Sequence, residues 1–259
     1  MTLLSEVTAA LSSVRDPELD RPVTDLGFVS RITVKIPSGV RVELRLPTYF
    51  CAPNFAWLMV ADARDAVAAV PGAGQVEVVL LDHFVSSEIN AGVAAASSFA
   101  DSFSSDDLDS SLASLRTTFE RKAHLAASER LARALLASGV PAASLPSLSL
   151  AAASSSSPAG AAAVARRRER LGIVSSWAFC DDRGDPIDAA RLPQWLRFAR
   201  TVRVSIDGNA GFCQGLLETR YRAERAKYSP QDDQNLTTAT PWTSPWLPQG
   251  YGKDLPAEA

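Results

Sequence analysis

The chain has 259 residues, a net charge of −3 and a hydrophobic fraction of 46%, much of it alanine. This charge offers no electrostatic attraction to nucleic acid. No stretch approaches the roughly 18 apolar residues that cross a membrane, the first residues lack a secretion leader pattern, and three widely spaced cysteines are no disulfide framework. We therefore expect a cytoplasmic protein that binds neither nucleic acid nor membranes, and the few lysines among 26 basic residues indicate a bacterial source.

The first part of the chain combines one helix with a hairpin. Apolar residues recur at helical spacing over 3–14, and Pro17 ends that pattern. Apolar residues then largely alternate over 28–34 and 40–46, with Pro37-Ser38-Gly39 between the two runs. This pattern predicts a β-hairpin with one buried face.

A second helix and a third strand complete this unit. Residues 54–70 have a helical apolar face, Asn54 is a plausible N-cap, and Pro71-Gly72 ends the helix. Residues 76–81 then read as a strand. The order helix, strand, strand, helix, strand predicts an α+β domain over residues 1–90, with helices covering one side of the sheet.

The rest of the chain divides by composition. Residues 91–138 are predicted to form a helical extension, in which 107–138 is one long helix whose first turn Ser105 or Asp106 would cap. The Ala, Ser and Pro composition of 139–165 predicts a linker. Residues 166–228 suggest a second small α+β region with a strand at 202–206 and a helix interrupted at Pro193, and 229–259 is a Pro/Trp-rich tail.

Two features outside the first domain are candidate partner-binding surfaces. Aromatic residues in a proline-rich tail are costly to expose unless they dock on a partner. Three consecutive arginines suit an acidic partner surface, although a solvated helix start explains them equally well. The predicted partner-binding residues are Trp242, Trp246, Tyr251, Arg166, Arg167 and Arg168.

The first eighty residues resemble the iron–sulfur cluster assembly domain of SufT-type and PaaD-type proteins. The matching segments, in order, are Asp16-Pro17-Glu18, Asp25-Leu26-Gly27-Phe28-Val29, Thr48 with Cys51 three residues later, and Val70-Pro71-Gly72 before Val76-Glu77-Val78. The family usually has Thr-Pro-x-Cys-Pro, whereas this chain has Thr-Tyr-Phe-Cys-Ala-Pro at 48–53. The resemblance implies an iron or iron–sulfur cluster as transient cargo.

Cys51 is the leading candidate ligand. It stands before a predicted helix, where free amide groups favour a thiolate, the form that binds iron. The alternative is a small buried hydrophobic residue. Asp16, Glu18 and Asp25 are candidate oxygen ligands for the same ion, but Asp16 and Asp25 would equally cap a helix or a turn.

The remaining thiols and imidazoles give weaker signals. Cys180 and Cys213 each follow a phenylalanine, but no Cys-x-x-Cys spacing supports a shared metal with Cys51. His83 follows the third strand, where one histidine usually satisfies local hydrogen bonds, and His124 lies inside a predicted helix. No catalytic triad, phosphate loop or dinucleotide fingerprint is present.

These observations predict a non-enzymatic factor that holds or delivers iron or a cluster. By resemblance to PaaD-type proteins, its client would be a metalloenzyme, namely a multicomponent di-iron oxygenase component. A homodimer is one arrangement compatible with this role. The alternative is a structural or accessory subunit of an oxygenase complex that binds no metal.

Overall fold

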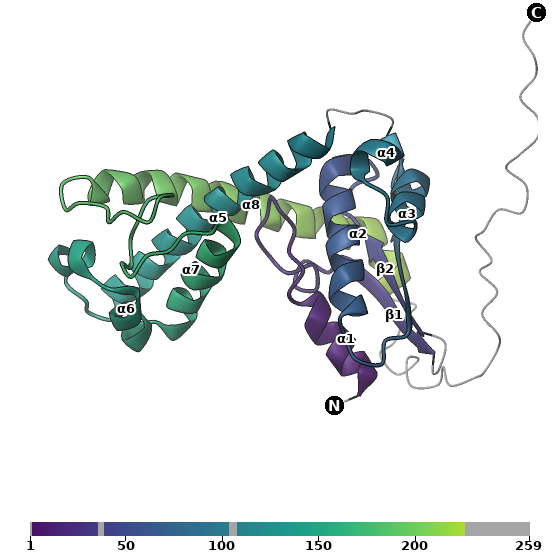
Figure 1. The fold of residues 1–259 in the computed structure, drawn as a ribbon, viewed down its shortest axis with the longest axis horizontal. Coiled ribbons are helices and arrows are strands. Elements are labelled where there is room, and N and C mark those ends of the chain that lie inside the picture. The colour runs from purple at the N-terminus through teal and green to yellow at the C-terminus, as the bar shows by residue number, and fades with distance from the viewer. Residues whose placement is uncertain (1, 36–38, 104–107, 226–259) are drawn as a thin grey trace, which may run out of the picture.

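The computed structural model describes residues 2–35, 39–103 and 108–225 and shows two packed parts (Figure 1). The amino-terminal domain contains α1 Leu3–Leu11, β1 Val29–Lys35, β2 Gly39–Arg45, α2 Pro53–Ala68, β3 Gln75–Leu81, α3 Ser86–Ala94 and α4 Phe99–Phe103. The helical part contains α5 Leu108–Ala137, the 3-10 helix η1 Ala142–Ser147, α6 Leu150–Ser156, α7 Pro158–Leu171 and α8 Leu192–Arg225. No helix among the described residues is long and apolar enough to cross a membrane.

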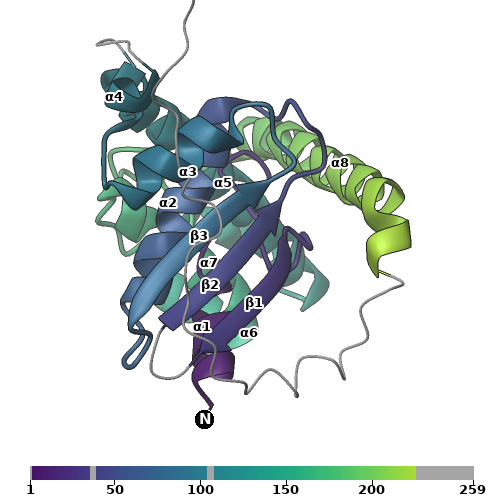
Figure 2. The ribbon, with the colours of Figure 1, turned by 90° about the vertical axis from the view of Figure 1, so that its right-hand side faces the viewer.

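The sheet confirms the predicted hairpin and third strand. β1 pairs antiparallel with β2, β2 pairs parallel with β3, and the order is β1-β2-β3. Helix α2 provides the crossover that a parallel pair requires. Alternate residues of β2, namely Val40, Val42 and Leu44, are buried, and the helices of the domain lie on one face of the sheet (Figure 2).

Helix α2 begins differently from the prediction. It starts at Pro53, with Ala52 at the N-cap position and no side-chain cap. Asn54 lies inside the first turn, where its Oδ1 accepts a hydrogen bond from Phe55 N at 2.9 Å. The predicted cap is therefore wrong. Proline suits this first position because its missing N–H would have no partner there.

The predicted linker at 139–165 is instead helical and packed. The Ser149 hydroxyl caps α6 by accepting a hydrogen bond from Ala152 N at 3.1 Å. Small side chains bring α7 close to α5: a Cβ added at Gly160 would lie 3.1 Å from Leu131 Cδ1. Ala153 and Val164 are fully buried in this core. Composition misled the prediction because alanine is the strongest helix former and permits close helix packing.

The predicted second α+β region is also helical. Residues 166–171 end α7, and the strand predicted at 202–206 lies within α8. Pro193 is the second residue of α8 and does not interrupt it. Between residues 166 and 225, β-type pairing is limited to isolated bridges. The buried residues of α8 reveal the helix by their seven- and four-residue steps: Ala199, Ile206, Ala210, Leu217 and Tyr221.

Helix α8 joins the two parts of the molecule. Its first turns pack on the helical core through Leu192, Trp195 and Leu196. Its last turns belong to the core of the amino-terminal domain through Ala210, Leu217 and Tyr221. The amino-terminal domain is therefore completed by a segment that lies more than 100 residues later in the chain.

Candidate functional site

Cys51 lies in the loop between β2 and α2. Its side chain is partly buried, and its Sγ lies 3.1 Å from Thr48 Oγ1. It stands two residues before Pro53, the first residue of α2. The predicted position at the start of a helix is thus confirmed, and the hydroxyl of Thr48 lies where it can donate to the sulfur.

His83 supports this loop from the end of β3. Its side chain is buried, and its Nε2 lies 2.7 Å from the carbonyl oxygen of Cys51. Since a carbonyl only accepts, Nε2 carries the proton, and Nδ1 accepts from Val85 N at 3.4 Å. Burial lowers the pKa of His83. Both ring nitrogens are therefore engaged locally, as predicted for a histidine at a strand end, and neither is free to bind a metal.

The three predicted carboxylate ligands lie in different surroundings. Asp16 is buried, and its Oδ1 accepts hydrogen bonds from Glu18 N and Leu19 N, each at 2.8 Å. Burial raises the pKa of Asp16 to about 6. The Glu18 carboxylate is more accessible and accepts from Asn209 Nδ2 at 3.2 Å, and Asp25 is exposed. Asp16 therefore has the turn-capping role that was the alternative to metal binding.

Helix α8 lies across this loop and fixes it by hydrogen bonds on both sides. Gln214 Nε2 donates to the carbonyl oxygen of Asp25 at 3.0 Å, and Arg21 donates to Gln214 Oε1 at 3.3 Å. Six residues further along α8, Arg220 donates to the carbonyl oxygens of Leu46 and Asp82. These contacts hold one stripe of α8 against the ends of β2 and β3 next to Cys51.

Cys213 lies on this stripe and is a site residue that spacing alone did not predict. It is partly buried and packs against the same core as Cys51. Burial is the largest cause of its raised pKa of about 11, and three nearby acidic groups add to it. These groups are Asp16, Cys51 and Glu18. A cation among them would favour loss of the Cys213 proton.

Cys180 is not part of this group. It is fully buried in the helical part. Burial raises its pKa, while Arg168 and Ser175 act in the opposite direction. The three cysteines therefore do not converge: Cys51 influences the pKa of Cys213, whereas Cys180 does not.

No group of three or more His, Cys, Asp or Glu side chains within the described part of the chain is arranged to hold a metal ion. The four predicted ligands, Cys51, Asp16, Glu18 and Asp25, are therefore not gathered into one preformed site. Their role as ligands stays a prediction. Cys213 packs against the same core as Cys51 and has Asp16 and Glu18 as electrostatic neighbours, and thiols and carboxylates are both types of ligand that iron takes.

The predicted partner-binding arginines separate into one exposed and two buried residues. Arg166 is exposed on α7. Arg167 is 6% exposed and pairs with Asp20, and Arg168 is 3% exposed and donates to the carbonyl oxygens of Trp177 and Ala178. The prediction of a partner surface therefore does not fit Arg167 and Arg168, because α7 turns both side chains into the molecule. Trp242, Trp246 and Tyr251 lie outside the described residues.

His124 is a buried hydrogen-bond partner of Arg168. Its ring is 1% exposed, and its Nε2 accepts a hydrogen bond from Arg168 Nε at 3.2 Å. Burial lowers the pKa of His124 to about 4, and the nearby charges of Arg168 and Arg167 add to the shift. The imidazole is therefore neutral and structural, and it lies inside α5, within the helix predicted there.

Comparison with known proteins finds similar sequences for the amino-terminal domain. Residues 4–78 match the family described as "Iron-sulfur cluster assembly protein". An iron-sulfur cluster carrier protein of Mycobacterium leprae is 38% identical over 78 residues, which are 30% of this chain and 20% of that protein. An uncharacterized protein of Methanocaldococcus jannaschii is 28% identical over 90 residues, 35% of this chain and 93% of that protein. No solved structure matches.

Proposed function

Because its amino-terminal domain matches the iron–sulfur cluster assembly family, we propose that this protein holds iron or an iron–sulfur cluster as cargo and delivers it to a client metalloenzyme. It acts as a maturation factor and not as an enzyme. The observation that carries the proposal is that Cys213 packs against the same core as Cys51 and has Cys51, Asp16 and Glu18 as electrostatic neighbours.

The chemistry of these groups suits a transient cargo. Thiolates are the usual ligands of iron–sulfur clusters, and carboxylates bind iron ions through hard oxygen atoms. Two thiols supply fewer ligands than the four that a cluster normally takes from cysteine. The missing ligands would come from the acceptor or from a second copy of the chain. An incomplete set of protein ligands favours release of the cargo to a client that supplies all the ligands.

Helix α8 gives the helical part a role at the site. It brings Cys213 next to the amino-terminal domain, and hydrogen bonds from Asn209 and Gln214 hold the helix there. Movement of α8 would change the number of thiols available to the cargo. The client would then bind on the helical part and the tail, where Arg166, Trp242, Trp246 and Tyr251 are the candidate contacts.

The proposed client is a component of a multicomponent di-iron oxygenase. This choice rests on the resemblance of the first eighty residues to PaaD-type proteins. Co-purification of the chain with such a component, with and without residues 230–259, tests it. Loss of the complex on truncation supports the role of the tail, whereas unchanged binding refutes it.

Anaerobic reconstitution with ferrous iron and sulfide tests the cargo. We expect the full chain to bind iron and sulfide with charge-transfer absorption in the visible range. Cys51→Ser should abolish the absorption and Cys213→Ser should weaken it. Cys180→Ser is the matched control, because this thiol is buried away from the loop. Unchanged binding by Cys51→Ser would refute the proposal.

The second candidate is an accessory subunit of an oxygenase complex that binds no metal. The capping of Glu18 N and Leu19 N by Asp16 favours it, because this carboxylate has a structural role. A stable stoichiometric complex with a client, formed equally well by Cys51→Ser and carrying no iron on this chain, would establish this alternative.

A further inference from the structure

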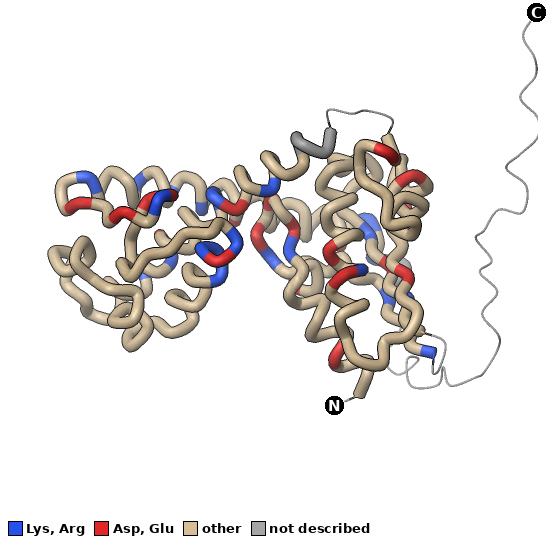
Figure 3. The backbone as a smooth tube through the Cα atoms, in the orientation of Figure 1, with Lys and Arg blue, Asp and Glu red and all other residues tan. Residues whose placement is uncertain are grey.

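A second site lies where the helical part meets the amino-terminal domain. Charged positions gather on the facing sides of the two parts (Figure 3). A cavity of about 430 Å³ opens there between the end of α1, the loop that follows it, and α7. This volume lies within the range of small-molecule sites in proteins, roughly 300–1,000 Å³.

The lining of this cavity is strongly positive. Four arginines line it, and one carboxylate, that of Asp20, accompanies them. The four are Arg15, Arg166, Arg167 and Arg170. A neighbouring cavity of about 470 Å³ shares Arg15 and Arg170 but is balanced, because its three arginines face three acidic residues. The excess of positive charge therefore belongs to the first cavity and not to the junction as a whole.

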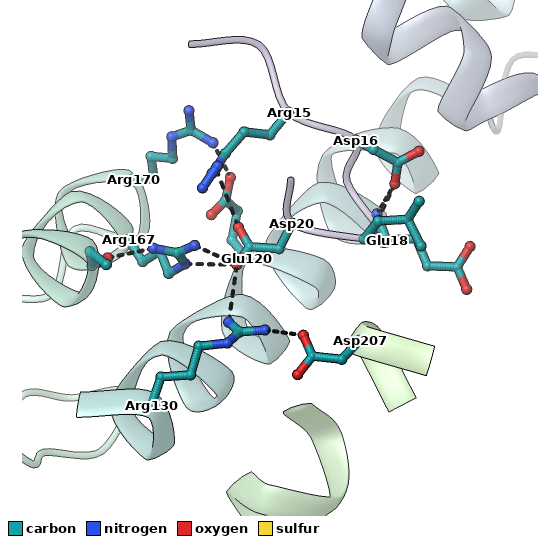
Figure 4. A network of polar contacts seen from close by, with 11 residues as sticks. Arg15, Asp16, Glu18, Asp20, Glu120, Arg130, Arg167, Arg170 and Asp207 are labelled. Carbon is teal, nitrogen blue, oxygen red and sulfur yellow. Dashed lines mark hydrogen bonds and ion pairs between the residues drawn. The ribbon is translucent and has the colours of Figure 1, made fainter. Parts of the chain in front are cut away.

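The carboxylates of Asp20 and Glu120 at the junction already form ion pairs with arginines (Figure 4). Asp20 Oδ2 accepts from Arg167 Nε at 3.1 Å, and Asp20 Oδ1 lies 3.5 Å from Arg15 Nε. Arg170 pairs with Glu120 at 2.9 Å. Asp20 and Glu120 together offset two of the four guanidinium charges. An excess of two positive charges remains at the cavity.

Two of the arginines have groups to offer a ligand. Within the described residues, Arg166 is exposed and makes no ion pair or side-chain hydrogen bond. The Arg15 side chain is 23% exposed, and its Nε lies 3.5 Å from Asp20 Oδ1. Burial lowers the pKa of Arg15, and repulsion from Arg167, Arg166 and Arg170 adds to this while Asp20 opposes it. The guanidinium groups are thus close enough to repel one another.

We propose that this cavity binds a phosphoryl group, as inorganic phosphate or as the phosphate of a nucleotide. A dianion matches the excess of two positive charges, which a single carboxylate does not. Guanidinium groups bind phosphate oxygens through paired, charge-assisted hydrogen bonds. The anion would also relieve the repulsion among the arginines and tie α7 to the loop after α1. This site is separate from the thiols and goes beyond the proposed function.

Isothermal titration of the full-length, metal-free chain with inorganic phosphate tests the site, with ATP in a second arm. We expect saturable binding that weakens with added chloride. Arg166→Gln should raise the dissociation constant about tenfold or more, because it removes a charged hydrogen-bond donor. This change leaves the fold intact, since Arg166 has no partner among the described residues. Arg15→Gln is a second variant with the same expected effect.

Arg200→Gln is the matched control, because Arg200 is exposed on α8 and does not line the cavity. Tighter binding of ATP than of phosphate assigns the site to nucleotides, and equal or weaker binding assigns it to free phosphate. The assignment would be overturned if neither phosphate nor ATP binds, or if Arg200→Gln weakens binding as much as Arg166→Gln does. Tighter binding of succinate, a dicarboxylate, than of phosphate would also overturn it. Cys51→Ser should bind phosphate normally, which separates this site from the proposed cargo site.

Discussion

Asp20 is the residue on which the junction between the two parts depends most. Its side chain is 6% exposed, and it accepts hydrogen bonds from Arg167 Nε and Nη2, whose side chain is 7% exposed. Arg15 and Arg130 also approach it. Asp20→Asn removes the negative charge and leaves a buried guanidinium without its counterion. This substitution tests whether the amino-terminal domain and α7 are held together by that charge.

The expected cost follows from the burial of the pair. Removing one partner of a buried ion pair costs about 3–5 kcal/mol. The lower end applies here, because Arg167 Nη1 keeps its hydrogen bond to the Ala163 carbonyl oxygen at 2.6 Å and asparagine keeps one acceptor oxygen. We therefore expect a loss of about 3 kcal/mol in the free energy of unfolding. For a chain of this size, that loss lowers Tm by about 6–12 °C.

Urea unfolding followed by circular dichroism measures this loss, and calorimetry gives Tm. Asp65→Asn is the matched control: its side chain is 78% exposed and its contact with Arg64 is 3.8 Å long. The control should stay within about 0.5 kcal/mol of the native chain. A loss below about 1 kcal/mol for Asp20→Asn, or an equal loss for both variants, would refute the reasoning from buried charge.

Three further predictions concern other parts of the chain. Burial raises the pKa of Asp16 to about 6, so its contribution to stability is present below pH 3.8 and is lost as the pH rises through 6. Asp16→Asn should flatten the pH dependence of unfolding in that range, and an unchanged slope would contradict the assignment. Gly39→Ala should cost about 3 kcal/mol in chemical denaturation, because Gly39 has a φ of +142° and a Cβ there would lie 2.0 Å from Gln75 O; a change below about 0.5 kcal/mol would contradict that packing. Hydrogen exchange should show protected amides across α6 and α7, whereas a linker would exchange at once.

The amino-terminal domain could be predicted because its signals are local. The alternation of Val40, Val42 and Leu44 marks a strand with one buried face, and the helical spacing before Pro17 marks α1. Neither depends on which segment packs against it. The position of Cys51 before α2 could be predicted for the same reason, since the turn and the helix are set within a few residues.

The helical part could not be predicted because its signals depend on packing. Alanine-rich sequence is equally compatible with a linker and with tightly packed helices, and the burial of Ala153 and Ala161 becomes evident only against α5. The alternation over 202–206 is real, but it is contained within a longer pattern of seven- and four-residue steps that runs through α8. The longer pattern is the one that indicates the helix.

Cys213 was missed because its relation to Cys51 is tertiary. The two residues are far apart in the chain, and only the path of α8 over the loop after α1 brings them to one core. The same holds for Arg167 and Arg168, which read as a solvated basic run. Their burial depends on Asp20 and on the carbonyl oxygens of Trp177 and Ala178, which no local pattern indicates.

Native mass spectrometry of the chain purified without oxygen tests the central claim most directly. The intact chain should carry the added mass of iron, with or without sulfide, and the Cys51→Ser chain should lose that mass while keeping the same charge-state distribution. An added mass of iron that is equal in both chains would contradict the assignment of the cargo to the thiol before α2.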